Sequence, residues 1–360
     1  MKLLSILAGA LLAVSASAQH FGTVFSLDND PTDNRVHVMF RGPTGNLIPV
    51  GSHSTGGTGT GSGLGSQGAL ATNKSGRTLL AVNPGSNEVS MFRVIAGIYP
   101  VLLDREPSGG MRPTSVAVHG RLVYVLNADS DSITGFRRRG PRLIPIAGAT
   151  YPLSGASVAA AQVGFSPDGS HLVVTERATD TIAVFPVKPN GRLGNAQFVP
   201  SAGPTPFGFL FRDDGTLVVS EAAGGAAGAS VVSSYYIDGN GGLQVVTGAA
   251  ATNQAAACWI AIPKNGDFAY TTNTADGTLS GFSLDATGNL ALLDPSGVTG
   301  NLGAAARPID FDFTANGRFL YVLDSAGDEI RGFYRKPDGS LLPLSVQVPL
   351  ADGHAGLLAR

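Results

Sequence analysis

The feature that most constrains this chain is a sequence pattern that recurs about every 49 residues. Each copy has an alternating apolar run, a turn ending in glycine, a β-branched or aromatic run, a polar break, and a third run ending in an aromatic residue. The turns "SPDG" and "RDDG" supply the Asp and Gly that tight hairpins prefer. The aromatic residues that end the third runs are Phe40, Phe92, Phe136, Phe185, Tyr236, Phe282 and Phe333.

This repeat predicts the fold. A period of about 40–50 residues with four short strands is typical of one β-propeller blade. Seven aromatic marks indicate seven blades, and no helical period competes with them after the N-terminal segment. The chain is therefore predicted to be all-β, a seven-bladed β-propeller of four-stranded antiparallel blades over residues 19–360.

The two ends of the chain are predicted to meet in one blade. The first copy begins at "GTVFSLD", which matches a second strand, so it lacks a first strand. The C-terminal "DGHAGLLAR" resembles "SQGALAT", which opens the second copy as an innermost strand. We expect the C-terminal strand to pair into the first blade, because closure of the ring removes the open edges of an arc.

The N-terminus reads as a secretory signal peptide over residues 1–18. Lys2 precedes an apolar stretch, Leu3 to Val14, and Ala16-Ser17-Ala18 follows as a small-x-small cleavage site. The stretch is too short for the alternative, a membrane anchor, and no other segment is long enough to span a bilayer. The protein is predicted to be secreted, or periplasmic in a bacterium, and Asn73 begins a sequon for N-glycosylation.

Composition excludes several classes of function. Charged residues make up 14% of the chain and the net charge is −2, which argues against nucleic-acid binding and electrostatic membrane attachment. Cys258 is the single cysteine, so it is expected to be a buried thiol and not half of an internal disulfide. The glycine-rich segment "GSHSTGGTGTGSGLGSQG" is predicted to be a flexible connection between the first two blades.

No cofactor is predicted. The six histidines do not pair at zinc spacing, and the acidic runs "LDNDPTDN" and "NADSD" lack the closing Glu of a calcium loop. A calcium ion held by carboxylates in the central channel remains an open alternative.

One polar residue ends the second strand of every copy. The second strand runs antiparallel to the first, so its end lies with the start of the first strand at one face of the ring, here called the mouth. Asn and Asp commonly end strands by making turns, whereas Glu has no such preference, so Glu176 and Glu221 are candidate catalytic bases. This polar ring comprises Asp28, Asn83, Asn127, Glu176, Glu221, Asn273 and Asp324.

The starts of the first strands bring cations to the same mouth. Arg112 and Arg307 are predicted to hold a carboxylate of a substrate, and His354 to act as an acid or base. Arg177 and Trp259 lie near these positions as further substrate-binding candidates. The alternative is a set of ion pairs that rims the channel. The aligned starts are Ser66, Arg112, Ala159, Thr205, Ala256, Arg307 and His354.

The segments "FSPDGSHLVVTE", "PTPFGFLF", "ACWIAIPKNGDFAYTTN", "RPIDFDFTANGRFLYVLD" and "HAGLLAR" resemble the seven-bladed propeller lactonase family. That family includes 6-phosphogluconolactonases and carboxymuconate cyclases, and the resemblance is closest to secreted 3-carboxymuconate cyclase-like proteins. Family enzymes carry histidines just before the fourth-blade "F-x-P-D-G" motif and an Asp at the following strand end. Here Ala159 to Ala161 and Gln162 take the histidine positions, which makes Gln162 a substrate-binding candidate, and Glu176 replaces the Asp.

Two functions follow from these observations. The first is a lactonase or muconate cycloisomerase-like enzyme acting on a small anionic lactone or carboxylate. The second is a non-catalytic secreted or cell-surface protein that binds a ligand or extracellular matrix components on the same scaffold. The glutamates and arginines favour an enzyme, whereas the missing histidines favour a binding protein.

Overall fold

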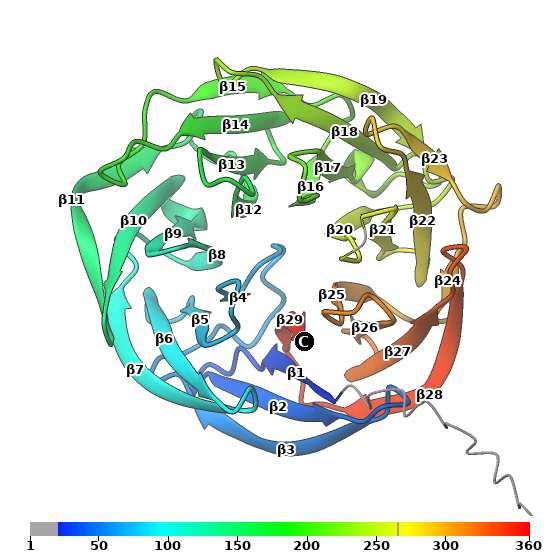
Figure 1. The fold of residues 1–360 in the computed structure, drawn as a ribbon, viewed down its shortest axis with the longest axis horizontal. Coiled ribbons are helices and arrows are strands. Elements are labelled where there is room, and N and C mark those ends of the chain that lie inside the picture. The colour runs from blue at the N-terminus through cyan, green and yellow to red at the C-terminus, as the bar shows by residue number, and fades with distance from the viewer. Residues whose placement is uncertain (1–20, 265) are drawn as a thin grey trace, which may run out of the picture.

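The computed structural model describes residues 21–264 and 266–360, so the predicted signal peptide lies outside the described residues. Seven β-sheets stand around a central axis, and each is antiparallel throughout (Figure 1). The helical segments of the described chain are two 3-10 turns, Ala128–Ser130 and Ala223–Gly225. The predicted seven-bladed β-propeller is confirmed.

Every blade runs from an innermost strand at the channel to an outermost strand at the rim. The first blade consists of β29 (Ala355–Ala359), β1 (Gly22–Leu27), β2 (Arg35–Arg41) and β3 (Leu47–Ser54). The second consists of β4 (Leu70–Thr72), β5 (Thr78–Asn83), β6 (Glu88–Ile95) and β7 (Tyr99–Pro107). The third consists of β8 (Pro113–His119), β9 (Leu122–Asn127), β10 (Ser132–Arg139) and β11 (Arg142–Pro152).

The remaining blades follow the same order. The fourth consists of β12 (Ala160–Phe165), β13 (His171–Glu176), β14 (Thr181–Pro186) and β15 (Gln197–Pro200), and the fifth of β16 (Pro206–Phe211), β17 (Leu217–Glu221), β18 (Val231–Ile237) and β19 (Leu243–Ala251). The sixth has β20 (Ala257–Ala261), β21 (Phe268–Asn273), β22 (Thr278–Leu284) and an outer edge split into β23 (Leu290–Leu292) and β24 (Gly300–Asn301). The seventh consists of β25 (Pro308–Phe313), β26 (Phe319–Asp324), β27 (Glu329–Arg335) and β28 (Leu341–Pro349).

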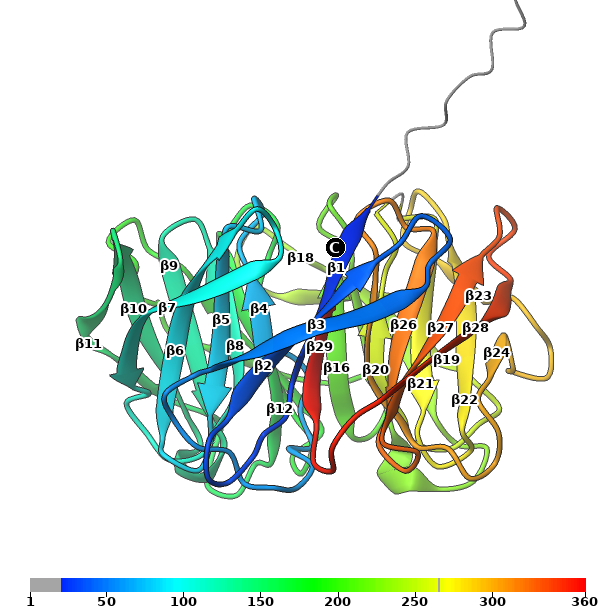
Figure 2. The ribbon, with the colours of Figure 1, turned by 90° about the horizontal axis from the view of Figure 1, so that it is seen from below.

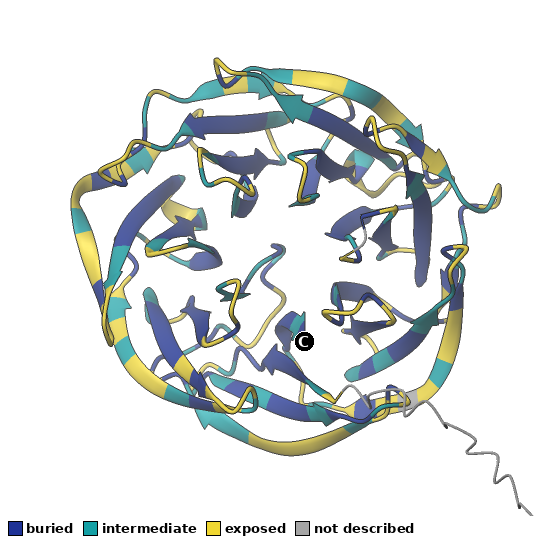
Figure 3. Cartoon of the chain, viewed as in Figure 1, coloured by how far each residue is buried: buried dark blue, intermediate teal, exposed yellow. Residues whose placement is uncertain are grey.

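The core lies between neighbouring blades. Side chains of a strand point alternately to its two faces, and in a propeller both faces of a blade meet another blade. All six residues of β5 are therefore buried, whereas the rim strand β7 alternates between exposed and covered positions. Figure 3 shows this gradient from buried inner strands to a partly exposed rim.

Two of the seven aromatic marks are displaced by one residue. Phe92 pairs with Leu79 and Phe185 with Leu172, and in the fifth blade the matching partner of Leu217 is Tyr235. The buried mark is thus Tyr235 and not Tyr236, and in the first blade it is Met39 and not Phe40. A shift of one residue moves a side chain to the opposite face of the strand. The choice of Tyr236 and Phe40 as the aromatic residues of their copies was therefore wrong.

The ring closes as predicted. β29 pairs antiparallel with β1, and Val24 lies opposite Ala359. Beyond the strands, the Thr23 N–H donates to the Arg360 carbonyl at 3.1 Å and the Arg360 N–H donates back at 2.8 Å. The C-terminus therefore lies beside β1 (Figure 2).

The glycine-rich segment does more than connect two blades. Between β3 and β4 it turns inward and reaches toward the axis of the ring (Figure 1). The Gln67 amide donates to the Ile260 carbonyl at 2.8 Å and accepts the Ile260 N–H at 3.0 Å, while the Gln67 backbone N–H donates to Ala161 at 3.1 Å. A Cβ at Gly208 would lie 2.2 Å from Gln67 Oε1, so this approach requires glycine there. The predicted flexible linker is instead tied to the fourth and sixth blades.

A second glutamine joins blades in the same way. The Gln162 amide donates to the Phe209 carbonyl at 2.9 Å and accepts the Phe209 N–H at 2.7 Å. Its side chain therefore replaces a missing strand partner between the fourth and fifth blades. Both polar ends of the amide are used, which leaves Gln162 in a structural position and not in the substrate-binding role predicted for it.

Gln162→Leu is expected to lower the free energy of unfolding by about 2–5 kcal/mol, because two buried backbone groups of Phe209 would lose their partners. Urea unfolding followed by circular dichroism measures the change. The exposed Gln347 on β28 offers a matched control, and Gln347→Leu should have little effect. Equal stability of the two variants would contradict the bridging role.

Candidate functional site

A pocket of about 290 Å³ opens at the mouth between the seventh and first blades. Its wall is formed by the glycine-rich segment from Gly61 to Ser66, the start of β25, the loop after β26 and the loop that leads into β29. Apolar contacts come from Leu64, Ile309, Leu323 and Leu350, and the side chains with chemistry are Trp259, Asp310, Asp324, Asp328 and His354. The volume is near the lower end of the range for small-molecule sites.

His354 lies at the start of β29, where the sequence predicted it. Its side chain is 5% exposed, and Nδ1 lies 3.2 Å from the Ser26 hydroxyl. Burial, with a smaller contribution from His37, lowers the pKa of His354 to about 4, so the ring is neutral at physiological pH. Nε2 is buried and has no hydrogen-bond partner among the described residues. A buried polar atom without a partner is rare in folded proteins and marks His354 as a functional candidate.

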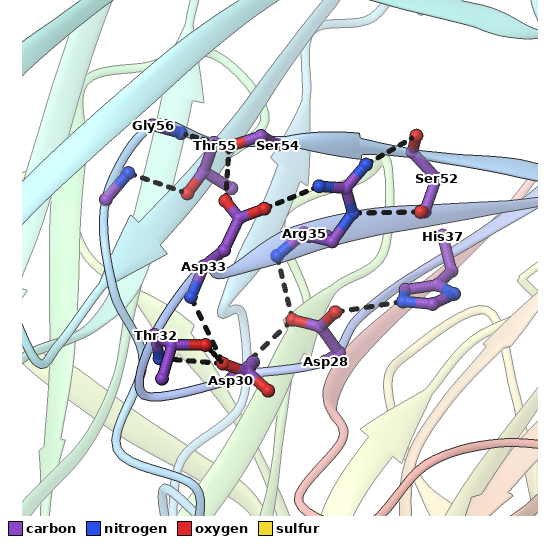
Figure 4. A network of polar contacts seen from close by, with 11 residues as sticks. Asp28, Asp30, Thr32, Asp33, Arg35, His37, Ser52, Ser54, Thr55 and Gly56 are labelled. Carbon is purple, nitrogen blue, oxygen red and sulfur yellow. Dashed lines mark hydrogen bonds and ion pairs between the residues drawn. The ribbon is translucent and has the colours of Figure 1, made fainter.

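His37 and Asp28 stand behind His354. The two imidazole rings have centroids 4.9 Å apart, and His37 Nε2 lies 2.9 Å from the Asp28 carboxylate. Asp28 also accepts the backbone N–H of Arg35 at 2.7 Å and of Asp30 at 3.2 Å (Figure 4). Asp28 thus holds the His37 ring in place, and the His37 ring packs against the imidazole in the pocket.

Asp310 is a buried acid of the pocket. It accepts the Gly356 N–H at 2.7 Å, which links β25 to β29. Burial raises the pKa of Asp310 to about 7 despite this hydrogen bond. A carboxyl group that titrates near neutral pH in a pocket is a candidate acid or base.

Trp259 lines the pocket, as predicted. Its indole N–H donates to the Ser66 carbonyl at 3.0 Å, so it also anchors the glycine-rich segment. Its ring lies 4.8 Å from that of Phe207, and the Arg177 guanidinium stands over Phe207 at 5.3 Å. Arg177 donates to the Ala159 carbonyl at 2.9 Å, and burial lowers its pKa. Arg177 therefore flanks the mouth, outside the residues that line the pocket.

The other two predicted arginines also point elsewhere. Arg112 forms an ion pair with Asp129 at 2.6 Å. Arg307 is exposed and donates to the carbonyls of Ala304 at 3.1 Å and Ala306 at 2.7 Å. The prediction that these guanidiniums gather around one substrate carboxylate is not met by this arrangement.

The polar ring exists, but of its seven side chains only Asp324 is among the residues that line the pocket. All seven are buried, because the side chains of a second strand point toward neighbouring blades and not toward the axis. Glu176 accepts the Ser154 N–H at 3.1 Å and the hydroxyls of Ser154 and Thr179. The expectation that the four carboxylates of the ring meet at the mouth is therefore not met by Glu176.

Glu221 is held in the same manner. Its carboxylate accepts hydroxyls from Ser201 at 2.6 Å, Ser233 at 2.6 Å and Tyr235 at 2.9 Å, together with the Gly203 N–H at 3.0 Å. These four bonds tie the second strand of the blade to its third strand and to the incoming loop. Glu176 and Glu221 thus have structural positions, and we do not retain them as catalytic bases.

The structure also places two other residues named in the sequence analysis, Cys258 and Asn73. Cys258 is buried as expected, and burial raises the pKa of its thiol to about 11. Asn73 lies in the turn before β5, where its side chain accepts the Thr78 N–H at 3.1 Å, and its glycosylation remains a prediction.

Within residues 21–264 and 266–360, no three acidic, histidine or cysteine side chains are grouped as a metal site requires. Nor does a helix in this part of the chain have the length and hydropathy needed to cross a bilayer.

Two residues of the pocket, and one residue that holds its glycine-rich wall, were not singled out from the sequence. Asp310 lies in the strand sequence "PIDFDF", where a polar residue at an alternate position of a buried strand is the only signal. Asp328 follows the second strand of the seventh blade by four residues, and Gln67 sits in a low-complexity run. Their roles depend on contacts between blades, which a single copy of the repeat does not encode.

The family is established by comparison with known proteins. The model of the family "Lactonase, 7-bladed beta-propeller" matches residues 32–142, 146–242 and 242–354. The chain therefore belongs to the seven-bladed propeller lactonase family. The finer resemblance, to 3-carboxymuconate cyclase-like proteins, remains a prediction. A search of curated proteins found no match.

Solved structures agree with this fold. A periplasmic gluconolactonase from Pseudomonas aeruginosa is 21% identical with a TM-score of 0.75, over 94% of this chain and 99% of that one. A candidate 6-phosphogluconolactonase from Bacteroides uniformis is 17% identical with a TM-score of 0.75, over 95% and 99% of the two chains. At these identities the likeness extends to the fold alone.

Asp310→Asn is expected to stabilise the protein more at pH 8 than at pH 4. The folded-state pKa of Asp310, about 7, lies above its ordinary value of 3.8, so the wild type loses stability as pH rises from about 4 to 7. Asn carries no proton to lose and still accepts the Gly356 N–H. Melting temperatures across this range measure the difference.

The exposed Asp213 provides a matched control, because Asp213→Asn should shift melting by a similar amount at all these pH values. A difference between Asp310→Asn and wild type that does not grow with pH would contradict the raised pKa.

Proposed function

We propose that this protein is a secreted lactonase that hydrolyses a small cyclic ester in the mouth pocket, with His354 as general base. Membership of the lactonase family supports the reaction class. The observation that carries the proposal is the buried, unpartnered Nε2 of His354 in the wall of the pocket. Secretion rests on the predicted signal peptide, and the Pseudomonas aeruginosa relative is described as periplasmic.

The proposed step needs one tautomer of His354. When Nδ1–H donates to the Ser26 hydroxyl, Nε2 carries a lone pair that can accept a proton. A water molecule attacks the carbonyl carbon of the ester, and Nε2 takes its proton. The ring C–O bond then breaks, and the ring oxygen receives the proton from the imidazolium. The product is an open hydroxy acid, and the neutral imidazole is restored.

Asp310 and Trp259 have supporting roles in this proposal. Trp259 offers an apolar ring face to the carbon skeleton of the substrate, and it fixes the glycine-rich wall through Ser66. Asp310 holds the start of β29 through Gly356, two residues beyond His354. Asp310 is therefore a positioning residue for His354.

His354→Gln is expected to lower kcat/KM for lactone hydrolysis by at least about 100-fold, the usual contribution of a positioned general base. The assay is proton release from a panel of lactones at pH 6.5, corrected for spontaneous hydrolysis. The control is His171→Gln, because His171 begins β13, next to the β12–β13 hairpin at the opposite face. Wild-type protein without turnover on any lactone would favour the non-catalytic alternative.

The decrease of kcat/KM at low pH, the acid limb of its pH profile, provides a second test of His354 as the base. His354 acts as a base only when neutral, so kcat/KM should fall as pH drops through about 4. The charge of His37 contributes to the low pKa of His354, so His37→Gln should move the limb to higher pH. An unchanged limb in His37→Gln would contradict the assignment of that limb to His354.

A further inference from the structure

Three blades share a hydrogen-bonded joint at the mouth, and the blade that forms the pocket lacks it. In three blades an Asn or Asp four residues after the polar ring accepts the first N–H of the next blade. Asn87 accepts Arg112 N–H at 2.7 Å, Asp131 accepts Ser157 N–H at 2.7 Å, and Asp180 accepts Thr205 N–H at 2.6 Å. These acceptors share a left-handed backbone, with φ of 58°, 41° and 49°. Each of these side chains therefore joins two neighbouring blades through its hydrogen bond.

Asp328 is the corresponding residue of the seventh blade. It has the same left-handed backbone, with φ of 48°, and its carbonyl accepts the Leu350 N–H at 2.7 Å. The N–H at the matching position is that of His354, four residues after Leu350. Among the described residues no hydrogen bond joins that N–H to the Asp328 carboxylate. Asp328 instead lines the pocket together with His354.

The pocket is consequently acidic. Asp324 and Asp328 line it, and Asp352 stands beside Asp328 at its rim. Burial, followed by repulsion from Asp352 and Asp324, raises the pKa of Asp328. Asp324 is held by the N–H groups of Arg307 at 2.8 Å and Ala326 at 3.2 Å, and its nearest cation, Arg331, is 4.0 Å away. No Lys or Arg is among the residues that line the pocket.

We propose that this site selects uncharged, polyhydroxylated lactones over phosphorylated or carboxylated ones, and that Asp328 is a specificity-determining residue. This inference rests on the proposed function. Carboxylates only accept hydrogen bonds, so they suit the hydroxyl groups of a sugar-derived ring. A phosphate or carboxylate in the same pocket meets like charge, and no cationic residue lines the pocket to offset the repulsion, which costs binding energy.

The charge of the pocket also fits the direction of the reaction. Hydrolysis converts a neutral ring into a hydroxy acid, which is ionised at neutral pH. The acidic rim repels this product while it accepts the neutral substrate. The anionic substrate that the arginines of the sequence suggested is therefore replaced by a neutral one.

The test compares glucono-1,5-lactone with its 6-phosphate on the purified protein in EDTA at pH 6.5. We expect kcat/KM to be at least about tenfold higher for the neutral lactone. Asp328→Asn should narrow this ratio, mainly by lowering KM for the phosphate. Asp338→Asn is the matched control, because Asp338 is an exposed acid in the β27–β28 turn of the same blade. A preference for the phosphorylated lactone, or an unchanged ratio in Asp328→Asn, would overturn the inference.

Binding separates this inference from the proposed reaction. Trp259 is the only tryptophan of the chain and lines the pocket, so its fluorescence reports occupancy without turnover. Glucitol and glucitol 6-phosphate are suitable probes because neither contains an ester ring to hydrolyse. If neither lactone is hydrolysed, the proposed function fails. Tighter binding of glucitol would then still support the charge selection, and tighter binding of the phosphate would refute it.

Discussion

The pairing of β29 with β1 is the interaction on which the site depends. It joins the two ends of the chain without a covalent link, so the ring has one seam held by hydrogen bonds. Two buried acids of β25 reinforce this seam from the neighbouring blade, because Asp310 accepts the Gly356 N–H at 2.7 Å and Asp312 accepts the Ala359 N–H at 2.9 Å. Burial raises the pKa of both to about 7, so the seam is held by groups that destabilise the fold when ionised. His354 is placed by the first residues of that same strand.

The glycine-rich segment reaches inward from the ring and is hydrogen-bonded to other blades. Gln67 carries the glycine-rich segment to Ile260 and Ala161, and Trp259 fastens Ser66 beside it. Glycines allow this segment to pass close to other backbones, and Gly208 leaves room for the Gln67 amide. The segment whose glycine-rich composition suggests a flexible linker thus forms one wall of the pocket. The pocket lies between this segment and the residues of the seam.

The fold was predictable from the sequence because each copy of the repeat contains its own turns and alternation. Seven copies also allowed errors in one to be judged against the others, and the displaced marks at Tyr236 and Phe40 did not change the number of blades. The site was harder to predict. Glu176 stood out as an exception to the Asn and Asp pattern, yet its carboxylate accepts Ser154 and Thr179 within the scaffold. His354 was found because it occupies a strand start, whereas Asp310 depends on a contact between β25 and β29.

The position of the site follows from how the repeat is broken. In the second, third and fourth blades, residue pairs such as Asp180 and Thr205 satisfy each other by a hydrogen bond. At the seam the corresponding pair is Asp328 and His354, and that hydrogen bond is not made among the described residues. A carboxylate and an imidazole are therefore left in one pocket by the same local change. Mutations that restore the regular joint are expected to stabilise the ring and to alter the proposed site, so stability and the proposed function oppose each other at this blade.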